Sequence, residues 1–230
     1  MSWTVTGAAS NSASSGATIE FATSAHGLTI VDGDLVIVAI NTNNDNATIA
    51  ASDGTSWTAE VDNKSDMSGE TSTYSVLWLI ASSEPANYTF THGGSERWSI
   101  SIMVATPDSG TPAIDVNAVH SHEVSGTLDG VATGITTAAN SLGFCTFMDD
   151  NTGQASDFSA DNGYTAHNPE GDESQVSAYQ VDVAGGATSD ITLTGMANSD
   201  KTYSSHMSWV HGGAPSVVPT PELMMLGVGV

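Results

Sequence analysis

His120 and His122 form the residue pair in this sequence whose spacing best suits metal binding. Because they are two residues apart on a predicted strand, both imidazoles lie on one face, and Glu123 follows them. Such a set can hold a transition metal. We interpret the pair as two exposed histidines in a polar segment and keep a metal site as the alternative.

Segments rich in Asn and Asp could supply oxygen ligands for Ca²⁺. Asp149, Asp150 and Asn151 follow an apolar run, and Asn41–Asn46 follows another. Carboxylate and amide oxygens of this kind bind Ca²⁺. The sequence has no EF-hand spacing and no repeated acidic motif, so we interpret these residues as turn formers. We predict no cofactor, with Ca²⁺ as the alternative.

The sequence has no catalytic motif that we can identify. Gly93-Gly94-Ser95-Glu96 does not match the Gly-x-Ser-x-Gly pattern of a nucleophile elbow. Among 26 acidic residues, some pair will lie at the separation of glycosidase carboxylates by chance. We predict that the chain is not an enzyme, and a glycoside hydrolase is a distant alternative.

Five aromatic residues could form a platform that stacks on sugar rings. Three of the tryptophans lie in long predicted strands, where packing in a core or between subunits is the commoner role. A glycan-binding surface is therefore the alternative to core packing. The five residues are Trp57, Trp78, Trp98, Trp209 and Tyr164.

The single cysteine and three histidines are predicted to be structural. Cys145 cannot form an internal disulfide, and its apolar run, Leu142–Met148, predicts a buried thiol. His92 and His211 each precede Gly-Gly and mark strand ends. His206 lies inside a predicted strand, where we expect it to be partly buried and hydrogen-bonded.

The charge balance excludes two classes of partner. The 230 residues carry a formal net charge of -23, because only 3 are Lys or Arg. So few bases cannot follow a phosphate backbone or attract an anionic membrane surface. No apolar run approaches the roughly 18 residues of a spanning helix, and MSWTVTGAAS does not resemble a secretory signal. We expect a protein made and used without Sec export, unless a signal has been removed.

The whole chain is predicted to be β. Strand-like runs are separated by clusters of Gly, Asn, Asp and Ser. In Trp98–Ile102 the apolar residues fall on one face and the serines on the other. No window shows an apolar stripe with a period of 3.6 residues, so we expect almost no helix.

An internal repeat sets the predicted architecture. The order strand, Asx-rich loop, aromatic turn, long strand, short strand, long strand occurs twice. Leu35 and Leu142 begin corresponding strands, and Trp57 and Tyr164 follow them at the same distance. One unit alone would leave an apolar sheet face in water, so the two should pack together. We predict an all-β, antiparallel two-sheet jelly-roll-like sandwich of roughly ten strands, with two small sandwiches in tandem as the alternative.

The expected domain boundaries follow from the repeat. Residues 1–16 are expected to be an N-terminal extension and residues 17–212 the sandwich. Within the sandwich, repeat one is expected at about 17–106 and repeat two at about 131–212.

Five segments of the sequence together carry a resemblance to known proteins: Gly33–Val38, Gly54 with Trp57-Thr58, Ser83–Thr91, Pro112–Asp115 and Gly134–Leu142. In these segments the sequence resembles a set of phage and prophage virion-associated β-sandwich proteins, most of them without an assigned role. The resemblance covers roughly residues 17–212, and it implies the architecture more than any function.

Residues 213–230 differ in composition from the rest of the chain. Pro215, Pro219 and Pro221 favour an extended chain, and the apolar run Leu223–Val230 follows. Val217–Glu222 is slightly similar to a bacterial sorting tail, but the sequence lacks the spanning segment and basic end of such a signal. We expect an arm that lies on a neighbouring subunit. Its predicted partner-binding residues are Leu223, Met224, Met225, Leu226 and Val228.

These observations favour a non-enzymatic structural protein of a phage particle, assembled in the host cytoplasm and located in the virion. We expect an outer capsid decoration protein that forms a symmetric oligomer and contacts other virion proteins, such as the major capsid protein. A tail or fibre component, a glycan-binding adhesin module and an extracellular filament subunit are the alternatives. A filament subunit would donate a segment such as Ser2–Ala8, or residues 213–230, to a neighbour's sheet.

Overall fold

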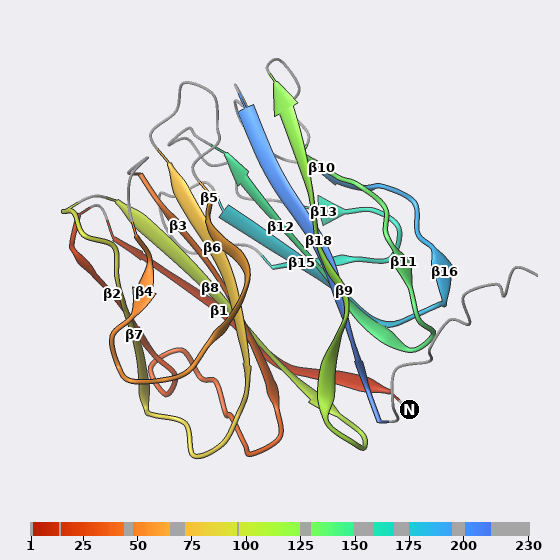
Figure 1. The fold of residues 1–230 in the computed structure, drawn as a ribbon, viewed down its shortest axis with the longest axis horizontal. Helices are drawn as coiled ribbons and strands as arrows, with labels where there is room; N and C mark the ends of the chain where they lie inside the picture. The colour runs from red at the N-terminus through yellow and green to blue at the C-terminus, as the bar shows by residue number, and fades with distance from the viewer. Residues whose placement is uncertain are drawn as a thin grey trace, which may run out of the picture.

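The computed structural model describes residues 2–13, 15–43, 48–64, 72–95, 97–124, 130–149, 159–167, 175–194 and 201–212. Side chains are described for all of these except 121–124, 149, 201 and 202. Within these ranges the chain consists of strands, turns and irregular segments, without a helix (Figure 1). The all-β prediction is therefore confirmed.

Repeat one forms two antiparallel sheets. Sheet A has the strand order β1-β8-β3-β6-β5, and sheet B has the order β2-β7-β4. The strands are β1 (Trp3–Ala13), β2 (Thr18–Ala22), β3 (Leu35–Thr42), β4 (Ala50–Ala51), β5 (Thr58–Lys64), β6 (Thr73–Ile80), β7 (Asn87–Thr91) and β8 (Trp98–Pro107).

Repeat two forms two sheets with the corresponding order. Sheet C is β14-β15-β12-β18-β9, sheet D is β10-β17-β13, and β11 pairs with β16. The strands are β9 (Pro112–Val124), β10 (Gly130–Ala132), β11 (Thr136–Thr137), β12 (Ser141–Asp149), β13 (Ser159–Ala160), β14 (Thr165–His167), β15 (Gln175–Val183), β16 (Gly186–Ala187), β17 (Ile191–Thr194) and β18 (Lys201–His211).

The strand orders confirm the internal repeat and the jelly-roll-like topology. In repeat one, β1, β8, β3 and β6 are neighbours in sheet A, and β2, β7 and β4 form the facing sheet B. In repeat two, β9, β18, β12 and β15 take the first set of places, and β10, β17 and β13 take the second. Eight strands arranged in this way form a jelly roll. The chain is therefore two jelly rolls in sequence.

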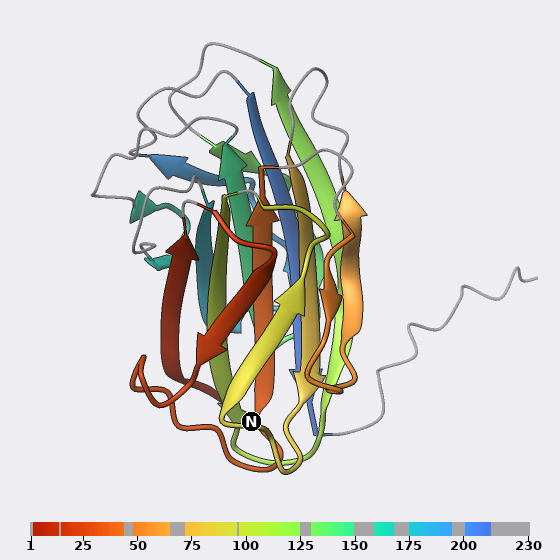
Figure 2. The same cartoon turned by 90° about the vertical axis from the view of Figure 1, so that its left-hand side faces the viewer.

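Four layers are stacked in the order B, A, C, D and enclose three apolar cores (Figures 1 and 2). Outer core 1 lies between sheets B and A, the inter-repeat core between A and C, and outer core 2 between C and D. The prediction of two sheets packed face to face describes A and C. The structure adds a small sheet on the outer face of each, because each repeat also has its own apolar strands to bury.

The middle strands are buried on both faces, as their sequences require. In β3, Leu35, Ile37 and Ala39 belong to the inter-repeat core. The alternate residues Val36, Val38 and Ile40 belong to outer core 1. A strand covered on both faces needs a continuous apolar run instead of alternation. The run of repeat two, Leu142–Met148, divides in the same way, with Cys145 and Phe147 in outer core 2.

The prediction that residues 1–16 form an extension outside the sandwich was wrong. Trp3–Ala13 is β1, the edge strand of sheet A, and it pairs antiparallel with β8. Repeat two likewise begins earlier than expected, with β9. In β1 the apolar alternation ends after Trp3 and Val5, and the small residues from Gly7 to Ala13 depend on the ladder with β8 for their conformation. Residues 3–8 therefore fill a place in their own sheet instead of a neighbour's.

A two-fold rotation along the strand direction relates the repeats. Hydrogen bonds join β8 to β15, β6 to β18 and β5 to β9, so sheets A and C run in opposite lateral order. When Leu35 and Leu142 are superposed, the pairing registers make Tyr74 equivalent to Gln175. Ser101 becomes equivalent to Ser205 in the same way.

Buried hydrogen bonds across the inter-repeat core follow this symmetry. The Tyr74 hydroxyl lies 3.2 Å from the Ser205 hydroxyl, and at the equivalent place Gln175 Nε2 donates to Ser101 Oγ at 3.1 Å. Gln175 Nε2 also donates to the Ala39 carbonyl at 2.9 Å. The serine face of β8 thus lies against repeat two, where partners satisfy its hydroxyls.

Candidate functional site

His120, a predicted metal ligand whose side chain is described, contacts the neighbouring strand β18 of its own repeat. Its Nδ1 lies 2.9 Å from Ser205 Oγ, and its ring centroid is 5.8 Å from that of Tyr203. Burial, and then the nearby Lys64 charge, lower the pKa of His120. His120 is exposed, as we expected, although its ring packs beside that of Tyr203.

Of the candidate Ca²⁺ segment Asn41–Asn46, residues 41–43 are described, and Asn41 is buried on β3. The remaining predicted site residues lie outside the described side chains. His122 and Asp149 are on described strands, but their side chains are not described, and Asp150 and Asn151 fall outside the described residues. The predicted partner-binding residues of the arm, Leu223, Met224, Met225, Leu226 and Val228, also fall outside. Among the side chains that the structure does describe, no three His, Cys, Asp or Glu residues are grouped to hold a metal ion.

The five aromatic residues do not form a common surface. Trp98 packs in outer core 1, Trp209 in the inter-repeat core and Tyr164 in outer core 2, and all three are buried. Trp57 is half-buried against Tyr88, with ring centroids 5.1 Å apart. In these positions they stabilise three separate cores and leave no shared platform for a sugar.

Outer core 2 contains a buried polar pair, Tyr164 and His206. The Tyr164 hydroxyl donates to His206 Nε2 at 2.7 Å, and His206 Nδ1 donates to the Thr133 carbonyl at 2.9 Å. Both ring nitrogens are thus satisfied in the neutral imidazole. Burial lowers the pKa of His206, although the Thr133 hydrogen bond and the Asp190 charge oppose the change. The predictions of a hydrogen-bonded His206 and a buried Cys145 are confirmed.

We expect the protein to lose stability as the pH falls below about 6.5, with His206 as one cause. Because the folded-state pKa of His206 is lowered, the unfolded chain takes up the proton first. The stabilisation from neutral His206 is complete above the unfolded pKa and declines as the pH falls toward the folded one. Urea unfolding at pH 7.5 and 5.5 should show a smaller loss in His206→Gln than in the parent chain. An equal loss in both would contradict this assignment.

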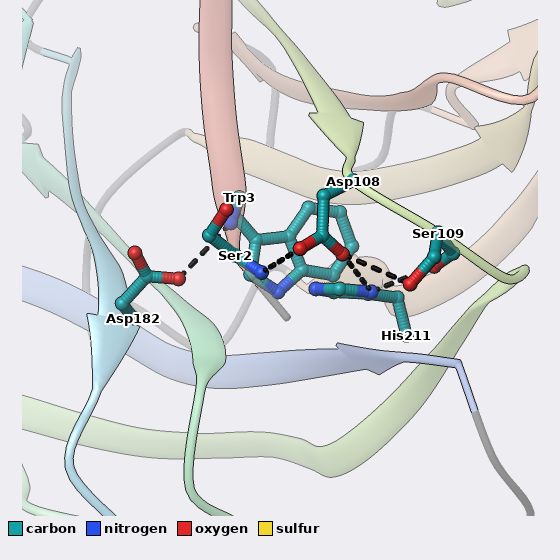
Figure 3. A network of polar contacts seen from close by, with 6 residues as sticks. All are labelled: Ser2, Trp3, Asp108, Ser109, Asp182 and His211. Carbon is teal, nitrogen blue, oxygen red and sulfur yellow. Dashed lines mark hydrogen bonds and ion pairs between the residues drawn. The ribbon is translucent and has the colours of Figure 1, made fainter.

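A polar network joins four distant segments at one end of the molecule (Figure 3). The Ser2 backbone N–H donates to Asp108 Oδ2 at 2.8 Å, and the Trp3 N–H donates to Asp182 Oδ1 at 3.0 Å. His211 Nδ1 donates to the Ser109 carbonyl at 2.7 Å. We call this network the junction; its residues are Ser2, Trp3, Asp108, Ser109, Asp182 and His211. It ties the start of β1 to the connection between repeats and to the end of β18.

The junction also fixes the point from which residues 213–230 leave the sandwich. Trp3 and His211 pack edge to face with ring centroids 4.7 Å apart. Gly212 lies so close to Gly110 that a side chain on Gly110 would overlap its backbone. Burial would raise the pKa of Asp108, but hydrogen bonds from Ser109 and Ser2 help to lower it overall. The carboxylate therefore stays ionised at neutral and mildly acidic pH.

Several carboxylates that could do chemistry are bonded to the backbone instead. Asp53 accepts from the Thr89 N–H at 2.8 Å, and the equivalent Asp161 accepts from the Thr192 N–H at 2.8 Å. Glu84 accepts from the Ser82 N–H and the Tyr88 hydroxyl, both at 3.0 Å. Asp53 and Glu84 border an open hollow of about 500 Å³. These bonds give the carboxylates structural roles in turns.

A groove follows the outer edge of β1. Its volume is about 380 Å³, and it is lined by Ala8, Ala9, Ser10, Ala25, His26, Gly27 and His167. We call it the β1 groove. Neither this groove nor the junction was predicted from the sequence, since their members are far apart along the chain. The one local signal was the absence of charged residues from Trp3–Ala13.

Comparison with known proteins found no matching family model, no matching curated protein and no matching solved structure. In the part of the chain that the structure describes, no helix is long and apolar enough to cross a membrane.

Proposed function

We propose that this protein is a non-enzymatic structural component of a virus particle, and specifically an outer decoration protein of a phage capsid. The observation that carries the proposal is the joining of two jelly rolls into one body through a fully buried core. Jelly rolls recur in viral capsid proteins as well as in lectin domains. This support is an analogy of fold, so the proposal needs a direct test.

The use of polar residues supports a structural role. The acidic side chains Asp34, Asp53, Asp115 and Asp161 all accept hydrogen bonds from backbone N–H groups. Serine hydroxyls and Gln175 bond the two repeats to each other. The described polar groups thus hold the fold in one conformation, as expected of a rigid building block.

The charge supports an outer position on the particle. A chain with net charge -23 and 3 basic residues is repelled by nucleic acid. Contact with a packaged genome is therefore unfavourable, whereas the outer surface of a capsid does not require it.

Quantitative mass spectrometry of density-banded particles from the source culture tests this proposal. Hundreds of copies per particle would support a capsid decoration protein. A few copies to a few tens would instead place the protein in the tail or a fibre. Absence from the particles would overturn the virion assignment and leave a glycan-binding module or a filament subunit.

Removal of residues 213–230 is expected to weaken self-association while the sandwich stays folded. The arm leaves the sandwich after Gly212, beyond the last described strand, so its loss removes no described core residue. Sedimentation velocity would report the association, and circular dichroism would report the fold. An unchanged association state in a folded, truncated chain would contradict a role for the arm in assembly.

A further inference from the structure

We propose that the outer edge of β1 is the docking site for residues 223–230 of a second copy of this chain, which add to sheet A as an antiparallel strand. This inference rests on the proposed function, in which residues 213–230 of one copy contact another copy. The edge of β1 is the surface that they would bind.

β1 is the edge strand best suited to accept another strand. Within the described chain its one strand neighbour is β8, so it is an edge strand of sheet A, and edge strands can pair with another chain. Its 11 residues include no charged side chain. The opposite edge of sheet A, β5, carries Glu60, Asp62 and Lys64, and its pairing with β6 shifts register twice. Charges and bulges of this kind discourage strand addition.

The β1 groove gives an extended segment a place to lie. Ala8, Ala9 and Ser10 are consecutive, and side chains alternate along a strand. Three consecutive residues can therefore border one hollow only where the hollow runs along the strand's edge. Their side chains are small, which lets another backbone approach closely.

The borders of the groove favour a single strand over a second sheet. Residues 25–27 follow β2 of sheet B, and His167 belongs to β14 of sheet C. Sheets B and C lie on opposite sides of sheet A, so the groove is bordered on both sides. One extended segment fits between these borders better than the edge of another copy's sheet.

Charge selects the segment that can occupy the groove. Two copies with net charge -23 repel each other, so a contact between them is favoured where neither surface is charged. Residues 223–230 contain no charged residue and no proline, and six of the eight are Leu, Met or Val. This composition matches the uncharged edge of β1 and is compatible with a strand.

The position of Gly212 favours a neighbouring copy over the same chain. The junction places the end of β18 beside the start of β1 (Figure 3). A chain running from there along its own β1 would pair in parallel, whereas every strand pairing in the described part is antiparallel. Parallel pairing is slightly less stable. The ten residues 213–222 can span up to roughly 33 Å, enough to reach a neighbour.

Cysteine cross-linking between two full-length variants tests this site. One copy carries Ala8→Cys and the other Val228→Cys, and the mixture is oxidised. Burial raises the pKa of the native Cys145 thiol, so it will not compete. The control replaces Ala8→Cys with Ala113→Cys, an exposed position on β9, the strand equivalent to β1. We expect a several-fold higher yield of mixed dimer with Ala8→Cys than with the control.

Equal yields for the two positions would overturn the proposal, as would a disulfide formed within one chain when both changes are made together. Cross-linking of Ala8→Cys copies to each other without the Val228→Cys partner would show pairing of two β1 strands and would also overturn it. These outcomes leave the copy number on particles unaffected, so failure of this site is distinguishable from failure of the virion assignment.

A charge placed in the groove provides an independent measurement. Ala8→Arg should weaken self-association by about tenfold or more, because strand addition would bury an unpaired charge. Ala113→Arg adds the same charge at the exposed control position and should leave association near that of the parent chain. Equal association of both folded variants would contradict docking on β1.

Discussion

Replacement of Trp209 by alanine is expected to lower the free energy of unfolding by about 3–5 kcal/mol. Trp209 is fully buried in the inter-repeat core. Its ring lies edge to face with Trp78 and Phe144, at centroid separations of 6.2 and 6.3 Å. The indole packs among side chains of both sheets, so its removal leaves a cavity that the surrounding structure can fill only in part.

Urea unfolding followed by circular dichroism measures this effect. The two repeats share the inter-repeat core, so the parent chain should unfold in one cooperative transition. Trp57→Ala is the matched control, because Trp57 is half-buried against outer core 1. Trp57→Ala should lower the free energy of unfolding clearly less than Trp209→Ala does. An equal cost, or a loss below about 1 kcal/mol for Trp209→Ala, would show that the inter-repeat core does not hold the repeats together.

The sequence predicted the strands whose apolar runs are continuous or alternate. Leu35–Ile40 and Leu142–Met148 are apolar along their length because both of their faces are covered. The recurrence of such runs at the same spacing predicted the two repeats. The sequence could not determine the register of the last strand of each repeat, where the pairings with Leu35 and Leu142 make Ala105 equivalent to Trp209. Alternating strands align equally well when shifted by two residues, since the face of each side chain is unchanged.

The sequence could not predict the number of layers. In Trp98–Ile102 the serines form a polar face, and such a face is compatible with water or with a polar partner. Here the partner is Gln175 and Ser177, more than 70 residues away.

The sequence also did not predict β1 as a strand. After Val5 its small residues show no apolar alternation, and pairing with β8 makes them a strand.

The sequence likewise predicted only those site residues whose environment depends on their own strand. Cys145 and His206 were predicted correctly because their own strands indicated burial. The junction combines Ser2, Asp108 and His211, whose contacts span more than 100 residues of sequence. A local pattern carries no information about such contacts, so the exit point of residues 213–230 could be located only in the folded chain.

Gly143→Ala is the second change with a large expected effect, and it tests the packing under Tyr164. A Cβ atom at Gly143 would overlap the Tyr164 hydroxyl oxygen and lie 2.9 Å from Tyr164 Cζ. Tyr164 cannot shift freely, because its hydroxyl donates to His206 Nε2 at 2.7 Å. The added methyl group must therefore displace the ring and break a buried hydrogen bond. We expect a loss of about 2–4 kcal/mol, the sum of an overpacking cost and an unsatisfied buried group.

A double-mutant cycle with Tyr164→Phe separates this mechanism from a general cost of replacing glycine. Without the hydroxyl, the closest contact is gone and the ring can shift, so Gly143→Ala should cost clearly less in the Tyr164→Phe background. Gly7→Ala is the control, since its Cβ would lie 2.5 Å from Leu28 Cδ2, the end of a flexible side chain that can rotate away. Additive losses in the cycle, or a loss at Gly7 as large as at Gly143, would mean that the Tyr164 hydroxyl does not fix the spacing between β12 and the turn before β14.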